Sequence, residues 1–409
     1  MRLTGCRSPG GRQSGGSSSP SDQGDGLSGG SSGSGEHAAG HVYAATNESA
    51  AGGNSIVVFD RGSDGRLTQA GTYPTGGSGS GAPAGSGFEQ SQNGVILGGQ
   101  PGADTTQFKD LLFAVNAGSD SITVFRTSGD TLVPVGPPVA SGGTKPTSLT
   151  VNKDLLCVLN AGALPLGQGG LAPSITGFRI GHDGVLTQIP GSTRALSGGS
   201  TAGAAQVEFD PTGRVVSVTQ RNANRIDNFL VQKDGTLSAP IPGASSGSNP
   251  FGFAESRKDP ATLIVAQGNF PPPTQGGASS YNIDPRTGAQ TTISGDVKNG
   301  QSDSCWVALS KGERYAFITN FFSNDVSSYT VGPHGTLTLK QAVAGVTDPN
   351  TPFGANDEAT SGNNREFLYA RNFVDGSIAQ FKINNDGTLT PLGNVGAVGP
   401  GTGFGLAAE

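Results

Sequence analysis

The sequence predicts an all-β protein, a seven-bladed β-propeller closed by pairing of its N- and C-terminal segments. Three observations lead to this prediction. One unit recurs seven times along residues 41–409. Its apolar runs are short and typical of strands, without a helical period. The chain also holds 68 glycines in 409 residues, which favours many tight turns.

Each unit contains two apolar runs and two turns. The first run ends in Asn or Gln, the second ends in an aromatic or apolar residue, and a turn such as Asp64-Gly65-Arg66-Leu67-Thr68 follows. Such Asp-Gly turns supply the positive φ angles that hairpins need. A unit of about four strands is typical of a propeller blade. The seven pairs of runs are Val42–Asn47 with Ile56–Phe59, Leu112–Asn116 with Ile122–Phe125, Leu156–Asn160 with Ile175–Phe178, Val215–Gln220 with Ile226–Phe229, Leu263–Gln267 with Ser279–Ile283, Ala316–Asn320 with Val326–Tyr329, and Leu368–Asn372 with Ile378–Phe381.

A further strand precedes the first run in every unit except the first, and we expect these strands to be innermost. They are Gln92–Leu97, Thr147–Val151, Gln206–Phe209, Phe251–Ala254, Ser304–Leu309 and Phe353–Asn356. The C-terminal segment Phe404–Ala407 resembles Phe251–Ala254, so we predict that it supplies the missing inner strand of the first blade. Closure of this kind removes the exposed edges that invite aggregation.

Residues 1–40 predict a disordered Gly/Ser-rich tether, because they contain too few apolar residues to form a core. Leu3-Thr4-Gly5-Cys6 resembles the lipobox of bacterial lipoproteins, although no apolar stretch precedes it. If the true start lies upstream, we expect a clipped signal, a lipid anchor at Cys6 and export to the cell envelope or the extracellular space. With the start as given, we expect a cytoplasmic protein.

Composition excludes several function classes. The formal charge is −6 and basic residues are not clustered, so no nucleic-acid partner is expected. No run of eighteen apolar residues is present, so no membrane span is expected. Metal-ligand spacings such as C-x-x-C are missing, and we expect neither a metal nor a cofactor. Cys157 and Cys305 lie in apolar runs, and we expect them to be buried free thiols. We expect the protein to be a monomer.

The chain resembles the seven-bladed β-propeller lactonase family, which includes 6-phosphogluconolactonase and the fungal carboxymuconate lactonising enzyme. The resemblance is carried by Leu111–Phe125, by Phe209-Asp210-Pro211-Thr212-Gly213 and by the Asp-Gly-x-Leu-Thr turns. It extends over residues 41–409 and implies the propeller fold and a lactonase activity. The family's catalytic His, Arg and Glu fall at Ala205, at Phe251 and near Gln267, so that set is not matched.

The ends of the first runs and the starts of the inner strands should meet at one rim of the propeller. A carboxamide ends every first run: Asn47, Asn116, Asn160, Gln220, Gln267, Asn320 and Asn372. These side chains either bond backbone groups of turns or contact a ligand. The inner strands bring aromatic residues to the same rim, which either pack there against glycines or form an apolar floor for a ligand. The candidate ligand-binding residues are Gln206, Phe251, Gln267, Ser304, Phe353, Phe404 and Asn372.

Three charged residues near this rim are candidate catalytic groups. Arg221 and Arg371 each neighbour a rim carboxamide, and Asp303 precedes Ser304. The two arginines are either solvated or paired, or they hold a carboxylate or phosphate. In an enzyme they would stabilise an oxyanion while Asp303 positions water.

Of three functions, the sequence favours the first, a binding propeller at the cell envelope. It would take a small polar ligand such as a lactone or carboxylate at its central rim, or a protein. The alternative is a lactonase acting on a sugar lactone or a muconate-type lactone. The third is a purely structural surface protein. An arginine and a carboxylate that converge at the rim would favour the enzyme, whereas a rim of amides and phenylalanines would favour binding.

Overall fold

The computed structural model describes residues 38–81, 92–98, 106–162, 172–351, 353–362 and 366–409. The chain divides into two units, Met1–His37 and Ala38–Glu409. The expected tether falls almost entirely on the first unit, which, with Cys6, lies outside the described residues.

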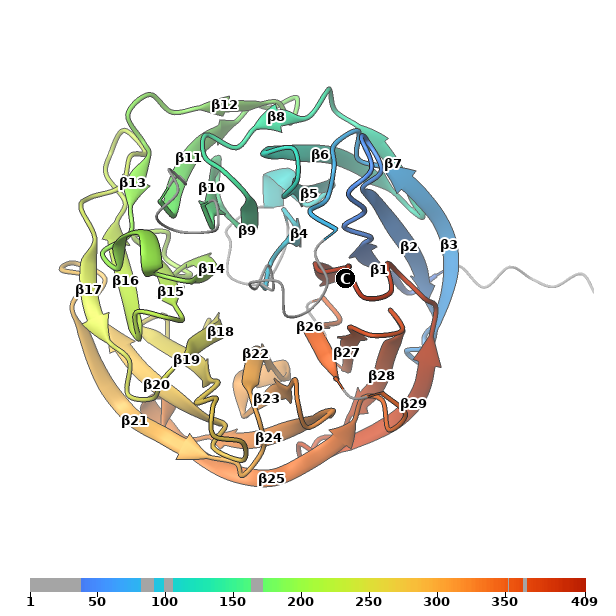
Figure 1. Ribbon diagram of the computed structural model, residues 1–409, viewed down its shortest axis with the longest axis vertical. Coiled ribbons are helices and arrows are strands. Elements are labelled where there is room, and N and C mark those ends of the chain that lie inside the picture. Colours follow the sequence, from blue (N-terminus) through green and yellow to red (C-terminus); the bar gives the residue numbers. More distant parts are fainter. Residues whose placement is uncertain (1–37, 82–91, 99–105, 163–171, 352, 363–365) are drawn as a thin grey trace, which may run out of the picture. The chain divides into compact units, whose positions relative to one another are not determined.

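The second unit is a ring of seven antiparallel sheets, one per blade, as the sequence predicts (Figure 1). The first blade contains β1 Gly40–Ala45, β2 Ser55–Arg61 and β3 Leu67–Pro74; the second contains β4 Val95–Leu97, β5 Leu111–Asn116, β6 Ser121–Ser128, β7 Thr131–Pro134 and β8 Val139–Ala140; the third contains β9 Pro146–Asn152, β10 Leu155–Asn160, β11 Ser174–Ile180, β12 Leu186–Gln188 and β13 Arg194–Ala195. The fourth blade contains β14 Ala204–Phe209, β15 Val215–Gln220, β16 Arg225–Leu230 and β17 Ile241–Ala244; the fifth contains β18 Pro250–Glu255, β19 Thr262–Gln267, β20 Gly277–Ile283 and β21 Gln290–Lys298. The sixth blade contains β22 Ser304–Leu309, β23 Tyr315–Asn320, β24 Asp325–Val331 and β25 Leu337–Val346; the seventh contains β26 Ala355–Thr360, β27 Phe367–Asn372, β28 Ile378–Ile383 and β29 Leu389–Val395. Strand β30, Leu406–Ala408, completes the first blade.

Helical structure in the described residues is limited to four short 3₁₀ turns. They are η1 Thr106–Phe108, η2 Gly199–Thr201, η3 Lys311–Glu313 and η4 Pro333–Gly335. None of the described helices has the length and apolar character needed to cross a membrane.

The C-terminal strand closes the ring, which confirms the predicted closure. β30 pairs antiparallel with β1 and places Leu406 opposite Ala44 and Ala408 opposite Val42. The backbone continues this pairing, since the Glu409 N–H donates to the His41 carbonyl at 2.9 Å. The strand begins at Leu406 instead of the expected Phe404.

Two other inner strands begin later than predicted. β4 starts at Val95, so Gln92 precedes it, and the Gln92 side chain is bonded across the ring to Val307 of β22. β26 starts at Ala355, so Phe353 precedes it and packs in an aromatic cluster.

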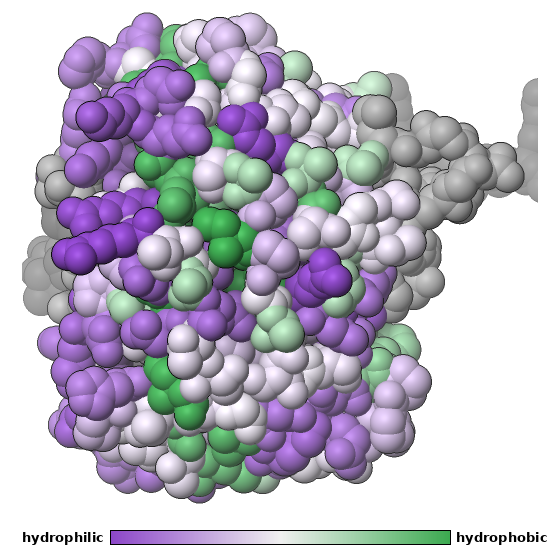
Figure 2. All heavy atoms as spheres, turned by 90° about the vertical axis from the view of Figure 1, so that its left-hand side faces the viewer, coloured by the Kyte–Doolittle hydropathy of each residue, from purple (hydrophilic) through white to green (hydrophobic). Residues whose placement is uncertain are grey.

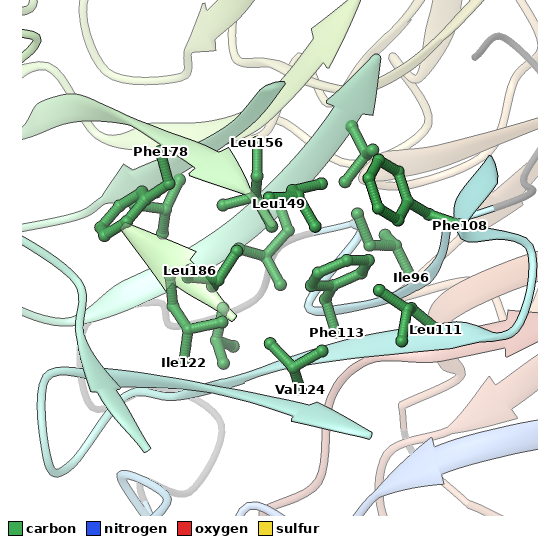
Figure 3. Close-up of a cluster of buried hydrophobic side chains, with 14 of the residues drawn as sticks. Ile96, Phe108, Leu111, Phe113, Ile122, Val124, Leu149, Leu156, Phe178 and Leu186 are labelled. Atoms are coloured by element: carbon green, nitrogen blue, oxygen red, sulfur yellow. The ribbon is translucent and has the colours of Figure 1, made fainter. Parts of the chain in front are cut away.

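Apolar cores lie between neighbouring blades. In Figure 3, Phe113 and Val124 of one blade meet Leu149 and Leu156 of the next. Between the first and seventh blades, Leu406 of β30 belongs to such a core. The outer surface is different: on the face shown in Figure 2, hydrophobic atoms form small separate patches among hydrophilic ones. Neighbouring blades thus hold the ring together by burying apolar faces that no single blade could cover alone.

Candidate functional site

The seven rim carboxamides are buried and form hydrogen bonds within the propeller. Each of the seven is at most 2% exposed. Asn320 is representative: its Nδ2 donates to Asp325 Oδ1 at 2.7 Å and to Ser327 Oγ at 2.8 Å, and its Oδ1 accepts from Ser304 Oγ at 2.6 Å. Asn372 similarly donates to Ser377 Oγ at 3.0 Å. These bonds tie strand ends to neighbouring turns, which is a structural use of the amides.

Two glutamines proposed for the ligand are also bonded internally. The Gln206 Nε2 donates to the Phe253 carbonyl at 2.9 Å, and its Oε1 accepts from the Phe253 N–H at 2.6 Å. Gln206 therefore bridges β14 to β18 like one more pair of strand hydrogen bonds. The Gln267 Oε1 accepts from Ser245 Oγ at 3.0 Å.

The candidate phenylalanines separate into two places. Phe251 and Phe353 join one aromatic cluster that also contains Trp306 and Phe321. Phe251 meets Trp306 edge-on at 5.3 Å between ring centroids, and Phe353 stacks on Phe321 at 5.5 Å. Phe404 packs instead in the core between the second and third blades.

Arg221 and Asp303 converge beside this aromatic cluster. The Arg221 guanidinium carbon lies 5.5 Å from the centroid of the Phe251 ring. Burial raises the pKa of Asp303, while the positive charge of Arg221 and a hydrogen bond with the Cys305 thiol act in the opposite direction. Asp303 is 6% exposed. The structure thus places a cation and a basic carboxylate together, with Cys305 and Trp306 beside them.

Arg371, which we expected at the same rim, is instead buried behind the ring-closing segment. Its guanidinium donates to the Val398 carbonyl, and a Cβ at Gly403 would collide with it. Asp357, opposite it on β26, is the nearby negative charge. Burial lowers the pKa of Arg371 and raises that of Asp357. Arg371 therefore anchors the closing segment to β27, and the cation that acts on Asp303 is Arg221.

A cavity of about 110 Å³ lies among the inner strands, where the sequence predicts no site. Its lining includes three carboxylates: Glu208, Glu255 and Glu358. Burial raises the pKa of Glu255 and of Glu358 well above the usual range. One signal was present in the sequence, because each of these glutamates stands near the end of an inner strand. Within the described part of the chain, no three His, Cys, Asp or Glu side chains are grouped so that they could hold a metal ion.

Comparison with protein families places this geometry in context. Residues 258–362, from the fifth blade into the seventh, match the family described as lactonase, 7-bladed beta-propeller. The comparison with curated proteins gave no match.

Several solved structures share the fold at low sequence identity. A protein from Lactobacillus plantarum is 18% identical with a TM-score of 0.67, covering 90% of this chain and 98% of that one. The periplasmic gluconolactonase of Pseudomonas aeruginosa is 17% identical with a TM-score of 0.62, covering 90% and 98%. A candidate 6-phosphogluconolactonase from Bacteroides fragilis is 16% identical with a TM-score of 0.62, covering 90% and 97%. At these identities the likeness shows the fold. The ring of seven sheets and the match over residues 258–362 identify the chain as a seven-bladed β-propeller that resembles the lactonase family.

Proposed function

We propose that the protein hydrolyses a lactone at the Arg221–Asp303 pair. The observation that carries this proposal is the convergence of this arginine and this carboxylate beside Phe251 and Trp306. The matched family and the gluconolactonase among the structural neighbours support the same class of reaction.

In this proposal Asp303 acts as the general base and Arg221 stabilises the oxyanion. The Asp303 carboxylate takes a proton from water, and the resulting hydroxide attacks the lactone carbonyl carbon. Arg221 stabilises the oxyanion with N–H donors that are always charged. The tetrahedral intermediate then breaks its ring C–O bond, and protonated Asp303 returns the proton to the leaving alkoxide. The product is the open hydroxy acid.

The surroundings of Asp303 suit this role. Burial raises its pKa above that of an exposed aspartate, which makes the carboxylate a stronger base. Phe251 and Trp306 exclude water on one side and strengthen the charge interactions. Because the base must be ionised, activity should fall on acidification at a pH above the ordinary aspartate pKa.

The binding interpretation has less support. It depended on rim amides and phenylalanines that would face a ligand, and those side chains bond or pack within the propeller. The comparisons also favour the lactonase alternative.

The test is acid release from glucono-δ-lactone and from 6-phosphogluconolactone, measured above the spontaneous rate. Asp303→Asn should lower kcat by about 10²- to 10⁴-fold, and Arg221→Gln by about 10²- to 10³-fold. Arg225→Gln is the matched control, because Arg225 is an exposed arginine of the same blade. Hydrolysis that is absent, or that survives both substitutions unchanged, would overturn the proposal.

A further inference from the structure

The cavity among the inner strands is built by every blade. Most of its lining residues lie in the inner strands, for example Leu149 of β9, Val307 of β22 and Leu406 of β30. Gln92 also lines it, and this side chain exchanges two hydrogen bonds with the Val307 backbone, at 2.9 and 3.2 Å. The cavity is therefore a fixed feature of the ring.

All the charged residues that line this cavity are acidic. Glu208 of β14, Glu255 of β18 and Glu358 of β26 line it, and no Lys, Arg or His is found among its described lining residues. A cation is therefore favoured when these carboxyl groups are ionised, and because burial raises the pKa of Glu255 and Glu358, its binding must displace their protons.

Two of these carboxylates lack the hydrogen bonds that buried groups require. Glu358 is 2% exposed, and neither of its carboxylate oxygens makes a hydrogen bond of ordinary geometry, although the Thr319 backbone N–H lies close enough to favour the charged form. Glu255 is 5% exposed, and its Oε1 also has none. Buried polar groups without partners are costly, and in native proteins each one calls for a ligand, a water or a function.

We propose that this cavity binds a small primary ammonium ligand, with Glu255 and Glu358 as acceptors of its N–H groups. An ammonium carries three donors and a full positive charge, which matches the unpartnered oxygens. Apolar neighbours such as Leu149 and Leu406 suit a short alkyl chain. A bare metal ion suits the site less, because no three acidic, His or Cys side chains in the described residues are grouped to enclose one.

The volume limits the size of the ligand. A cavity of roughly 150 Å³ holds benzene, which has six non-hydrogen atoms. The 110 Å³ found here therefore suits about four non-hydrogen atoms. Propylammonium has this size, and propan-1-ol is its uncharged counterpart. The site is separate from the proposed lactonase pair, since neither Arg221 nor Asp303 lines the cavity.

The test is calorimetric titration of the full chain at about pH 8 and low salt with propylammonium chloride. We expect saturable binding that weakens by about tenfold or more in Glu358→Gln and in Glu255→Gln. Glu366→Gln is the matched control, because Glu366 is an exposed glutamate of the same blade as Glu358, and it should bind as the parent does.

Three results would overturn the proposal: no propylammonium binding, equal binding of propan-1-ol, or unchanged affinity in Glu358→Gln. Both Gln variants keep the side-chain volume and remove a buried charge, so both should fold. If Glu358→Gln unfolds, Glu255→Gln on another blade gives the same test.

Discussion

Closure of the ring predicts an unusually sensitive C-terminus, and Leu406→Ala tests it. Leu406 is 3% exposed and packs in the core between the first and seventh blades, with Val42 and Tyr369. It also pairs with Ala44 through its backbone. The substitution leaves that backbone pairing intact and removes only the side chain that fills the last inter-blade core.

The expected loss follows from burial. A buried leucine replaced by alanine costs about 2–5 kcal/mol, and about 3 kcal/mol is a middle value. The propeller spans Ala38–Glu409, so at about 2 cal/mol/K per residue its unfolding entropy is about 0.8 kcal/mol/K. The Tm should therefore fall by about 4 °C. Val343→Ala is the control, because Val343 is 47% exposed and its substitution should cost less than about 0.5 kcal/mol.

Removal of residues 401–409 should have a larger effect. It deletes β30 and removes hydrogen-bond acceptors from two side chains. Asn356 Nδ2 loses the Gly403 carbonyl, and Asn47 Nδ2 loses the Thr402 carbonyl and keeps only Ser80 Oγ. Each buried group left unpaired costs about 1–3 kcal/mol, and a whole domain is stable by only about 5–15 kcal/mol.

The assay is differential scanning calorimetry of the parent chain, Leu406→Ala, Val343→Ala and the truncated chain. The truncated chain should show no cooperative transition near the parent Tm. The reasoning would be refuted if Leu406→Ala melted together with Val343→Ala, or if the truncated chain melted as the parent does.

Two further predictions concern stability. Gln206→Ala should lower the Tm by about 2–5 °C, because it leaves both backbone groups of Phe253 unpaired; a change in KM without a change in Tm would instead support the ligand role. Burial raises the pKa of Asp325 to about 7, so the folded chain keeps a proton that the unfolded chain releases from about pH 4 upward. Its contribution to stability is thus present at low pH and lost as the pH rises through about 7. Asp325→Asn should reduce the fall in Tm between about pH 5 and pH 8 in scanning calorimetry, and superimposable profiles would contradict this assignment.

Repetition explains why the fold was predictable from the sequence. The strand runs, the carboxamides at their ends and the Asp-Gly turns recur at matching positions in the repeated units. The two-residue alternation of side chains in β strands can also be followed in each copy. The likeness of Phe404–Ala407 to Phe251–Ala254 was enough to predict closure within two residues. The site was less predictable because it depends on which side chains meet across blades. Arg221 beside Asp303, and Gln92 bonded to Val307 across the ring, join segments with no local signal of contact.

Arg371 lies elsewhere than its sequence neighbour Asn372 suggests, and the alternation of strand residues explains why. Its place beside Asn372 suggested a shared rim, but neighbouring residues of a strand point to opposite faces. In β27, Phe367 and Tyr369 face the core shared with the first blade, and Leu368 faces the core shared with the sixth. Arg371 has the parity of Phe367 and Tyr369, so it points toward the first blade and the closing segment, where it donates to the Val398 carbonyl. The alternation alone could have separated Arg371 from Asn372. Which neighbour each face meets follows from the direction in which the ring is wound, and that is a property of the assembled blades.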